Sequence, residues 1–577
     1  MVVGNGEDQG YAGLGDVLRT RALDRPEQTA CVFIDRHGDE AAGVTYAGLD
    51  HDARALAVTL EERTSPGDRV LIMCPPGIDF VTGFFACQYA GLIAVPVMCP
   101  DAHNDGKGTR DRLAGIVKDC TPAAVLTTAE VAENLRAGDL GGTDVLLTSD
   151  SVPELADLWA AREQDLTAPA LLQYTSGTIG TAKGVVLSHA AVLDNLAGMA
   201  KVIIDDVGDV DECRGVSWLP VFHSMGLSVV LTTFLVGGRL ALLAPETFLA
   251  NPVTWLTTIT RERAQWTVAP NFGYEICAQK VTADQRAAVD LSSLRCAPIG
   301  AEAIRWPAME GFSAAFAEVG FQSSVFLPCY GLSEAMGFVC GARVPGAPPY
   351  IDLSMAELEA ESRVVAAGTP GTGRRVVGCG RMAKGMEAVI VGKDATVRAS
   401  GETGEIWLRG GAVAQGYWHR PQATAERFGA TLLNGEGPYL RTGDVGFLAD
   451  GQLFVLGRLD DLIIVDGRNH YPYDIEATAA SAHAALAEGK AAAFAYDGDG
   501  RTQLGVVVET GVGAGADGGV AVAEVVSSIR RAIAEEHQLH AAAVLLLKPG
   551  CLPVTASGKV QRRRSKEMFL AGEHDTW

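Results

Sequence analysis

The chain has 577 residues, of which 48% are hydrophobic and 20% are charged, so it is long enough for several compact cores and has a globular composition. Its 47 Lys and Arg residues stand against 70 Asp and Glu residues, which gives a formal net charge of -23. This excess of negative charge would repel nucleic-acid phosphates and anionic lipid surfaces, and it excludes nucleic acid as an expected partner.

The cysteines and the N-terminus indicate the cellular setting. The 12 cysteines are scattered singly and no Cys-x-x-Cys pair occurs, so we expect reduced thiols that pack in cores. The first ten residues carry Glu7 and Asp8 and do not resemble a secretion signal. The most apolar window, residues 226–244, is broken by Gly237 and Gly238 and predicts a buried helix, a turn and a strand. We therefore expect a cytoplasmic protein without a transmembrane segment.

The first third of the chain alternates between helix and strand patterns. Apolar residues recur at helical spacing over residues 45–60, and a strand pattern follows at 69–74. A second helix pattern through Phe80, Phe84 and Tyr89 then leads into a strand pattern at 92–98. This alternation is typical of an α/β fold with parallel sheets covered on both faces.

Two changes in composition divide the rest of the chain. Residues 343–375 are crowded with Gly, Pro and acidic residues, and only a short helix at about 355–362 fits their pattern, so we interpret them as an insertion. A turn-rich stretch at 457–461 then precedes a smaller unit. We expect a large N-terminal domain of several subdomains at 1–456 and a small α+β domain at 457–577. The smaller domain is predicted to contain strands at 491–496 and 503–509 and a helix at about 520–536.

A loop rich in glycines and hydroxyls carries the strongest chemical signal. It follows Tyr174 and precedes a strand pattern at 185–187. Glycines let backbone N–H groups approach phosphate oxygens, hydroxyls donate hydrogen bonds, and a lysine neutralises charge on a leaving pyrophosphate. The spacing differs from that of a Walker A loop. The residues expected to bind phosphate are Thr175, Ser176, Gly177, Thr178, Gly180 and Lys183.

Further motifs follow in a fixed order along the chain. They are Gly300-Ala301-Glu302, Tyr330-Gly331-Leu332-Ser333-Glu334, Gly404-Glu405-Ile406, Tyr439 to Asp444, Gly457-Arg458 and Pro553 to Lys559. With the phosphate loop, these motifs resemble the adenylate-forming superfamily of acyl-CoA synthetases, peptide-synthetase adenylation domains and luciferases. The resemblance implies an AMP-binding N-terminal domain that uses ATP and Mg²⁺ to activate a carboxylic acid.

The resemblance also implies roles for several of these motif residues. The ring of Tyr330 would contact adenine, Ser333 the α-phosphate, and Glu334 would act catalytically as a ligand of Mg²⁺. Asp444 would accept hydrogen bonds from the ribose, and Arg458 would contact the sugar or a phosphate. The other residues that the resemblance assigns to the nucleotide are Gly300, Ala301, Glu302 and Gly331.

The C-terminal domain is expected to bring a catalytic lysine to this site. Lys559 lies in a loop of Thr, Ser and Gly residues and would bridge the acid carboxylate and the α-phosphate. Both reactants are anionic, so the lysine would relieve their repulsion during attack. The resemblance implies that the small domain is mobile and turns about a hinge at Asp460.

Within the superfamily, the chain most resembles the fatty acyl-AMP ligases. The resemblance lies in Pro75 to Phe80, Trp218-Leu219-Pro220, Pro270-Asn271-Phe272, Phe326 to Gly331 and Gly467 to Pro472. That branch transfers the acyl group to the phosphopantetheine thiol of an acyl carrier protein, in polyketide, nonribosomal peptide or lipid biosynthesis. It also carries an insertion at the corresponding place, which would limit transfer to coenzyme A. His223 is assigned to catalysis, and the acid is expected to contact Trp218, Ser224, Met225, Asn271, Phe272 and Met336.

Three residues depart from the superfamily pattern. Ile179 and Ala182 alter the phosphate loop, and Ser224 stands where an Asp is expected after His223. Losing one neutral hydrogen bond typically costs about 0.5–1.5 kcal/mol, and the charged motif residues are retained, so we expect an active enzyme. The alternatives are a coenzyme A ligase, an amino-acid adenylation enzyme, and a homologue that binds acyl groups or nucleotide without catalysis. The amino-acid alternative lacks the acidic residue that an α-amino group would need.

Overall fold

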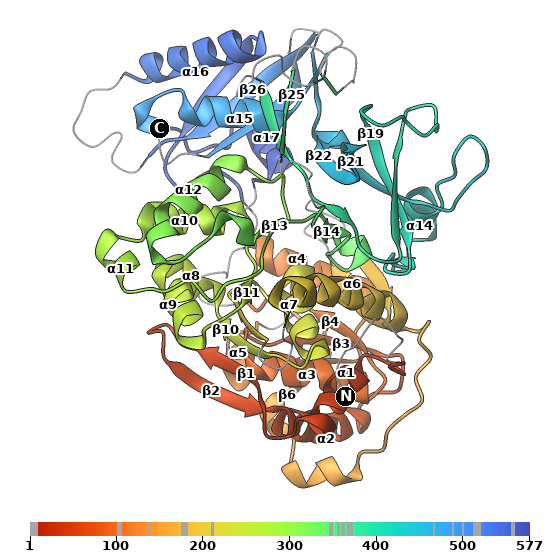
Figure 1. Ribbon diagram of the computed structural model, residues 1–577. Helices are drawn as coiled ribbons and strands as arrows, with labels where there is room; N and C mark the ends of the chain where they lie inside the picture. The colour runs from red at the N-terminus through yellow and green to blue at the C-terminus, as the bar shows by residue number, and fades with distance from the viewer. Residues whose placement is uncertain are drawn as a thin grey trace.

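The computed structural model describes residues 10–577 except for 101–106, 137, 175–182, 209–212, 345–349, 355–357, 359–363, 366–372, 466–467, 487–489, 499–500, 512–520 and 555–559. In Figure 1 the N-terminal half of the chain forms the lower part of the molecule, and the C-terminal segment, coloured blue, lies at the top. No helix in the part of the chain that the structure describes is long and apolar enough to cross a membrane.

The largest sheet has seven strands. In spatial order they are β20 (Gly416–Tyr417), β8 (Gly184–Ser188), β7 (Pro169–Tyr174), β4 (Ile93–Pro96), β3 (Arg69–Met73), β5 (Ala124–Thr127) and β6 (Asp144–Leu147). Strands β3 to β7 run parallel to their neighbours, and β8 and β20 extend one edge in antiparallel fashion. Every residue of β4 and β5 is buried, as expected for strands covered on both faces.

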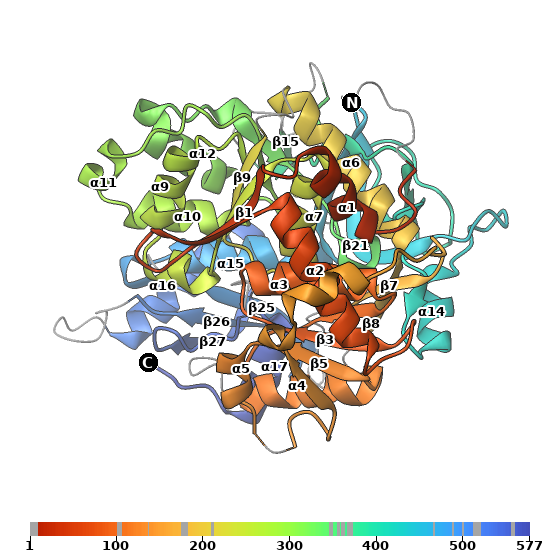
Figure 2. The same cartoon turned by 90° about the horizontal axis from the view of Figure 1, so that it is seen from below.

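A second sheet has five strands and packs over the first. Its spatial order is β11 (Trp266–Thr267), β9 (Arg214–Ser217), β10 (Arg239–Leu243), β1 (Thr29–Ile34) and β2 (Glu40–Thr45), all parallel except β2. Between the sheets lie α3 (Ile78–Tyr89), α6 (His189–Val207) and α7 (Ser224–Leu235), as Figure 2 shows for α3 and α7. Helix α3 contacts strands of both sheets, and α6, which contacts the larger sheet, packs on α7, which contacts the smaller.

The other helices of residues 10–428 include α1 and α2, which pack on α3, and several that follow in the chain. They are α1 (Gly15–Asp24), α2 (Tyr46–Glu61), α4 (Lys107–Cys120), α5 (Ala129–Glu133), α8 (Pro245–Ala250), α9 (Val253–Glu262), α10 (Asn271–Lys280), α11 (Ala283–Ala287), α12 (Trp306–Phe316) and α14 (Pro421–Phe428).

Several predicted elements are confirmed, and so is the α/β class. The helix expected at 45–60 is α2, whose N-terminus is capped by the Thr45 hydroxyl, which accepts a 3.1 Å hydrogen bond from the backbone N–H of Gly48. The apolar window 226–244 forms α7, a turn at Gly237 and Gly238, and β10. All of the cysteines are free, as expected.

Smaller sheets in the central part of the chain carry the motif residues. They are the parallel pair β12 (Ala297–Ile299) and β13 (Phe326–Pro328), the pair β14 (Cys340–Ala342) and β17 (Arg381–Met382), and an antiparallel sheet of β18 (Met386–Val391), β19 (Gly404–Gly410), β21 (Leu440–Ala449) and β22 (Gln452–Arg458). The β21–β22 register places Asp444 opposite Arg458. Two motifs of the sequence therefore meet in one hairpin.

The insertion contains strands that the sequence did not predict. Tyr350–Leu353 forms β15 and pairs in antiparallel fashion with β16 (Arg374–Val377), and the Arg375 guanidinium contacts both carboxylate oxygens of Asp352 at 2.7 and 2.9 Å. Each strand is short and its partner is distant in sequence, which left no local pattern to predict the pairing. The helix expected at 355–362 falls almost entirely outside the described residues.

The C-terminal unit has a hydrophobic core of its own. Its sheet consists of β25 (Ala491–Gly498), β26 (Arg501–Glu509) and β27 (Ala541–Leu547), with α15 (Pro472–Ser481), α16 (Val522–His537), α17 (Arg562–Ala571) and the hairpin β23 (Ile463–Val465) and β24 (Arg468–His470) around it. Ile463, Val506 and Ile529 lie in this core. The strands expected at 491–496 and 503–509 and the helix expected at 520–536 correspond to β25, β26 and α16.

Candidate active site

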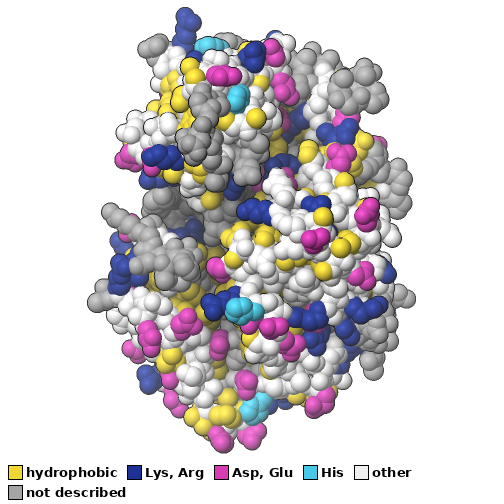
Figure 3. Space-filling view, turned by 90° about the vertical axis from the view of Figure 1, so that its left-hand side faces the viewer, with side chains coloured by type: hydrophobic (Ala, Val, Ile, Leu, Met, Phe, Trp, Pro, Cys, Tyr) yellow, Lys and Arg dark blue, Asp and Glu magenta, His cyan; other side chains and the backbone are white. Residues whose placement is uncertain are grey.

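A cavity of about 2070 Å³ lies where the central part of the chain meets the C-terminal unit. Its wall combines the 330–334 motif, the end of β22 and its following turn, and the start of α17. Figure 3 shows the molecule hollowed between its upper and lower parts on the face turned to the viewer. Motifs that are far apart in sequence therefore share one space.

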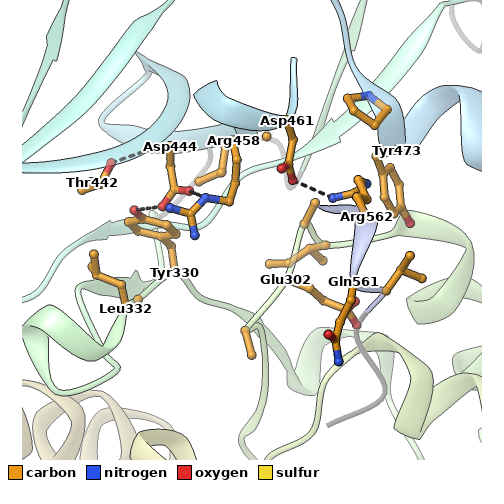
Figure 4. Close-up of a pocket in the computed structure, with 18 of the residues that line it drawn as sticks. Glu302, Tyr330, Leu332, Thr442, Asp444, Arg458, Asp461, Tyr473, Gln561 and Arg562 are labelled. Carbon is orange, nitrogen blue, oxygen red and sulfur yellow. Dashed lines mark hydrogen bonds and ion pairs between the residues drawn. The ribbon is translucent and has the colours of Figure 1, made fainter. Parts of the chain in front are cut away.

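The predicted adenine and ribose residues form one connected group in this cavity (Figure 4). The phenol of Tyr330 donates a 2.6 Å hydrogen bond to the Asp444 carboxylate, and the Arg458 guanidinium lies 3.6 Å from the other carboxylate oxygen. The backbone N–H of Asp444 donates to the Thr442 hydroxyl at 3.0 Å. Burial, and then the Asp444 charge, raise the pKa of Tyr330 well above its usual value, so the phenol stays a donor.

A second polar group surrounds the predicted magnesium ligand. Glu334 lies in a 3₁₀ turn, Ser333–Ala335, and its carboxylate accepts a 2.7 Å hydrogen bond from the Tyr417 phenol. The Lys183 ammonium lies 5.0 Å from the centre of the Tyr417 ring. Arg427 of α14 also lines the cavity. The Tyr417 side chain therefore contacts both Lys183, at the end of the predicted phosphate loop, and Glu334, the predicted magnesium ligand.

The residues expected to face the acid carboxylate lie beside this group. Ser224 and Ser333 both line the cavity, and their hydroxyl oxygens are 3.4 Å apart. His223 caps α7, because its Nδ1 accepts a hydrogen bond from the backbone N–H of Met225 at 3.3 Å. His223 and Met225 line the cavity as well. The structure thus places Ser224, which is predicted to contact the acid, beside Ser333, which is predicted to contact the α-phosphate.

An apolar part of the cavity extends between two helices. It is lined by Met199, Val202 and Ile203 of α6 and by Phe272 and Ile276 of α10. Such a lining suits a hydrocarbon chain, because the burial of apolar surface is favourable and does not depend on the direction of the contact. We call these five residues the acyl arm.

Three of the residues predicted to contact the acid do not line the cavity. Trp218 stacks on Phe248 with ring centres 3.9 Å apart and lies edge-on to Phe272 at 5.6 Å. Met336 is fully buried in the main core. Asn271 is also fully buried and ties down the following segment, since its amide donates to Ala303 O and accepts from Arg305 N, each at 2.9 Å. All three are buried outside the cavity lining, and Trp218 and Asn271 contact the lining residues Phe272 and Arg305.

Two motif glycines allow close backbone contact beneath the site. A Cβ on Gly331 would lie 1.8 Å from the carbonyl oxygen of Gly337, and one on Gly300 would lie 2.7 Å from that of Cys329. Neither position can therefore carry a side chain without a backbone shift. Ala301 and Glu302, which follow, line the cavity.

The predicted hinge residue lies at the junction of the two units. Asp460 is exposed in the 3₁₀ turn Leu459–Asp461 and lines the cavity. Next to it, Asp461 contacts Arg562 of α17 at 3.0 Å, and Arg562 also contacts Glu476 of α15 at 2.6 Å. Burial alone would lower the pKa of Arg562, but its carboxylate partners raise it, so this residue stays charged.

Several predicted residues lie outside the described part of the chain. These are the catalytic Lys559 and the phosphate-loop residues Thr175, Ser176, Gly177, Thr178 and Gly180. Lys183, at the end of that loop, and Val560 and Gln561, just after Lys559, are described and line the cavity.

The structure adds residues that sequence reasoning missed. Tyr417 and Arg427 line the nucleotide end, and an ion pair between Arg305 and Glu275 lines the wall near the acyl arm. Lys490 reaches the same wall from the C-terminal unit. None of these residues stands in a spacing that signals chemistry, and only the fold brings them to the cavity.

The donor set can be tested for its fit to magnesium. Among the described residues no group of three or more His, Cys, Asp or Glu side chains is placed to hold a metal ion. Magnesium bound with a nucleotide usually takes one or two protein carboxylates and completes its shell with phosphate oxygens and water. The Glu334 carboxylate on the cavity wall fits that role.

Comparisons with known proteins agree with this geometry. Residues 18–418 match the AMP-binding enzyme family, and residues 460–576 match the AMP domain of Disco-interacting protein 2-like proteins. The chain is 36% identical to the medium-chain-fatty-acid–[acyl-carrier-protein] ligase JamA of Moorena producens, over 98% of this chain and 96% of the relative. It is 32% identical to the long-chain-fatty-acid–AMP ligase FadD26 of Mycobacterium tuberculosis, over 96% of each chain.

A solved structure extends the similarity to three dimensions. The fatty acyl-adenylate ligase of L. pneumophila, in complex with acyl adenylate and pyrophosphate, matches with a TM-score of 0.75 and 34% identity. The match covers 97% of this chain and 96% of that one. The resemblance to adenylate-forming enzymes is confirmed: the chain belongs to the AMP-binding enzyme family, and its relatives include fatty acyl-AMP ligases.

Proposed function

We propose that the protein is a fatty acyl-AMP ligase that uses ATP and Mg²⁺ to convert a carboxylic acid into an acyl-AMP and then passes the acyl group to the thiol of a carrier protein. One observation carries the proposal. A single cavity joins the Tyr330–Asp444–Arg458 group, the Ser224–Ser333 pair and the acyl arm. The names and bound molecules of the relatives support the same chemistry.

In the first step a carboxylate oxygen of the acid attacks the α-phosphorus of ATP. A new P–O bond forms, the bond from the α-phosphorus to the bridging oxygen breaks, and pyrophosphate leaves. Tyr330 and Asp444 would hold the nucleoside, Ser333 would donate to the α-phosphate, and Lys183 and Lys559 would offset the charge of the phosphates and the carboxylate. Magnesium at Glu334 would further neutralise phosphate charge.

The acyl arm would hold the chain of the acid while its carboxylate reaches the two serines. Ser224 is a neutral hydroxyl and 3% exposed, so this end of the arm carries no fixed negative charge at that position. An uncharged position next to the reacting carboxylate avoids like-charge repulsion. This favours a simple fatty acid over an amino acid, whose ammonium group would need a carboxylate partner.

In the second step the thiol sulfur of a carrier-bound phosphopantetheine attacks the acyl carbonyl carbon. The C–O bond to AMP breaks, AMP leaves, and the thiol proton passes to solvent. No cysteine of this chain is needed as the acceptor. Burial raises the pKa of the Cys329 thiol, which lines the cavity, to about 12, so it stays protonated and a poor nucleophile.

The insertion contacts both the β21–β22 hairpin and the C-terminal unit. Its Leu353 and Leu358 share a buried cluster with Phe447 and Phe454 of the β21–β22 hairpin. Its Arg374 lies 3.1 Å from Asp474 of α15 in the C-terminal unit. Because the insertion contacts both units, we propose that it restrains their relative rotation and disfavours transfer to coenzyme A.

Pyrophosphate release tests the proposal. The protein is mixed with ATP, Mg²⁺ and saturated acids of graded length, and then with either coenzyme A or a carrier protein bearing phosphopantetheine. We expect acid-dependent pyrophosphate release, accumulation of acyl-AMP with coenzyme A, and discharge by the carrier.

Each alternative predicts a different result in the same assay. Rapid acyl-CoA formation would identify a coenzyme A ligase, and exchange that requires an amino acid would identify an amino-acid adenylation enzyme. A homologue that only binds its ligands would show no carboxylate-dependent pyrophosphate exchange with any acid.

A further inference from the structure

Tyr417 lies between two charged residues of the nucleotide end and contacts both. Its phenol donates a 2.7 Å hydrogen bond to the Glu334 carboxylate. The face of its ring receives the Lys183 ammonium, whose nitrogen is 5.0 Å from the ring centre. A ring face attracts a cation through its quadrupole, while a phenol O–H satisfies an anion. One uncharged side chain thus contacts both an anion and a cation.

The position of Tyr417 is fixed by its surroundings. The two-residue strand β20 pairs with β8, with Tyr417 opposite Val185. The backbone N–H of Tyr417 donates to the Thr424 hydroxyl at 2.9 Å, and Phe428 packs edge-on against its ring at 5.2 Å. The side chain is 9% exposed and lines the cavity. A ring held in this way has little rotamer freedom left.

Main-chain contacts link the same segment to both charged residues. The backbone N–H of Ala414 donates to the carbonyl of Glu334 at 2.9 Å, and that of Trp418 donates to the carbonyl of Gly184, next to Lys183, at 2.8 Å. The 414–418 segment therefore connects the turn that carries Glu334 with the strand that follows the phosphate loop. A shift of either would be transmitted to the other through Tyr417.

We propose that Tyr417 is a positioning residue for the adenylation step, which aims the Glu334 carboxylate at the nucleotide-bound magnesium and holds the Lys183 ammonium beside the phosphates. The proposal rests on the proposed function for the identity of the nucleotide. Because the ring and the phenol are uncharged, these contacts neutralise neither partner, and both charges remain to act on the ligand.

The chain contains a matched control for this arrangement. The Tyr439 phenol donates to Glu436 at 2.8 Å, and the Arg409 guanidinium lies 5.0 Å from the Tyr439 ring centre. The Tyr439 ring is 1% exposed and belongs to a separate cluster, and none of these three residues lines the cavity. A phenol-to-carboxylate hydrogen bond and a ring-to-cation contact are thus repeated away from the site.

The first experiment separates the phenol from the ring. Tyr417→Phe and Tyr439→Phe are made in the full chain, and ATP binding is measured by calorimetry with and without Mg²⁺. A hydrogen bond to a charged group is strong enough that we expect Tyr417→Phe to reduce the magnesium-dependent gain in ATP affinity about tenfold. Tyr439→Phe should leave that gain unchanged. Steady-state assays should show no change in the KM for the fatty acid with Tyr417→Phe.

The second experiment removes the ring as well. Tyr417→Leu keeps an apolar side chain of moderate size but loses the contact with Lys183. We expect this variant to bind ATP more weakly than Tyr417→Phe even without Mg²⁺, by about threefold, because the ammonium loses its ring contact. Thermal unfolding of all variants reports whether they fold.

A purely structural role makes the opposite prediction. Tyr417→Phe and Tyr439→Phe would then lower the unfolding temperature alike, and magnesium-dependent ATP binding would match the wild type, which would overturn the proposal. Failure of the proposed function is distinct from this outcome, since the wild-type protein itself would then show no pyrophosphate exchange that depends on a fatty acid.

Discussion

The nucleotide end and the acyl arm of the cavity are built from different kinds of residue. At the nucleotide end, polar side chains from short motifs contact one another, as Tyr330 does with Asp444 at 2.6 Å. Along the acyl arm, the cavity is lined by apolar side chains such as Val202 of α6 and Ile276 of α10, which carry no polar atom that could form a directional bond to a ligand. Substitutions at the first end should therefore change the use of ATP, and those at the second should change the choice of acid.

The largest effect is expected at the residue that is predicted to contact both the acid and the nucleotide. Lys559→Ala removes the charge predicted to bridge the carboxylate and the α-phosphate. We expect acyl-AMP formation to fall by about 10²–10³-fold while ATP binding persists, because the lysine acts on charge that develops during attack. Single-turnover adenylation and equilibrium ATP binding measure the two quantities.

A second lysine of the C-terminal unit provides the control. Lys548 pairs with Asp575 at 2.6 Å, and both side chains are exposed. Lys548→Ala should therefore leave adenylation unchanged. An unaltered single-turnover rate with Lys559→Ala would contradict the assignment of that lysine.

The next effect should be confined to the nucleotide end. Asp444→Asn retains the shape of the side chain but loses its negative charge. That charge pairs with Arg458 and strengthens the hydrogen bond that the carboxylate accepts from the Tyr330 phenol. We expect the KM for ATP to rise about tenfold, the size of effect associated with a hydrogen bond to a charged group, while the KM for the acid stays constant. Asp394→Asn, at an exposed pair with Arg398, is the control. Equal changes in both KM values would contradict the division between the two ends.

The nucleotide end was the part of the site that could be predicted from sequence. Four of its residues belong to compact motifs: Tyr330, Glu334, Asp444 and Arg458. The type of each polar residue and the order of the motifs were enough to indicate what each could bind. The structure brings these four to one cavity. Helix α2 and the helix–turn–strand unit of α7 and β10 could be predicted for a related reason, since their apolar spacing and turn residues are local signals.

The remainder depends on contacts that are distant in sequence. Tyr417 acquires its partners only when β20 pairs with β8, and two residues of sequence cannot indicate that pairing. The β15–β16 pair of the insertion escaped prediction for the same reason. Trp218 and Met336 were predicted to contact the acid, but an apolar side chain suits the core as well as a cavity wall, and only packing decides between them.

Enlarging a residue of the acyl arm should change the choice of acid without changing the use of ATP. Val202→Phe would fill part of the space between α6 and α10, so we expect the longest acid accepted to become shorter. One or two methylene groups of an acid that fit or do not fit a pocket change kcat/KM by about tenfold, and we expect a difference of that size between acids of adjacent lengths. The KM for ATP should not change. Lys201→Phe, at the exposed neighbouring position on the same helix, is the control. A chain-length profile that stays the same would show that Val202 does not limit the acid.

The smallest effect is expected at the contact between the insertion and the C-terminal unit. Arg374 pairs with Asp474 at 3.1 Å, lies 4.6 Å from the centre of the Tyr471 ring, and donates to the carbonyl of Leu456 at 2.8 Å. Since Leu456 precedes the predicted hinge residue Asp460 and the other two follow it, one guanidinium contacts residues on both sides of the junction. Arg374→Ala should ease rotation of the C-terminal unit and raise acyl transfer to coenzyme A.

The size of that increase follows from the strength of the contact. Both side chains of the pair are largely buried, but both return to water when the contact opens, so its net strength is about 0.5–1 kcal/mol. We therefore expect acyl-CoA formation to rise about twofold to fivefold, with the rate of acyl-AMP formation unchanged. Arg375→Ala is the matched control, because the neighbouring guanidinium pairs with Asp352 inside the insertion. If both variants changed acyl-CoA formation equally, the effect would come from loosening the insertion itself. A gain with Arg374→Ala alone would assign the restraint to its contact with the C-terminal unit, and would make the choice of acceptor a property of domain rotation rather than of the nucleotide end.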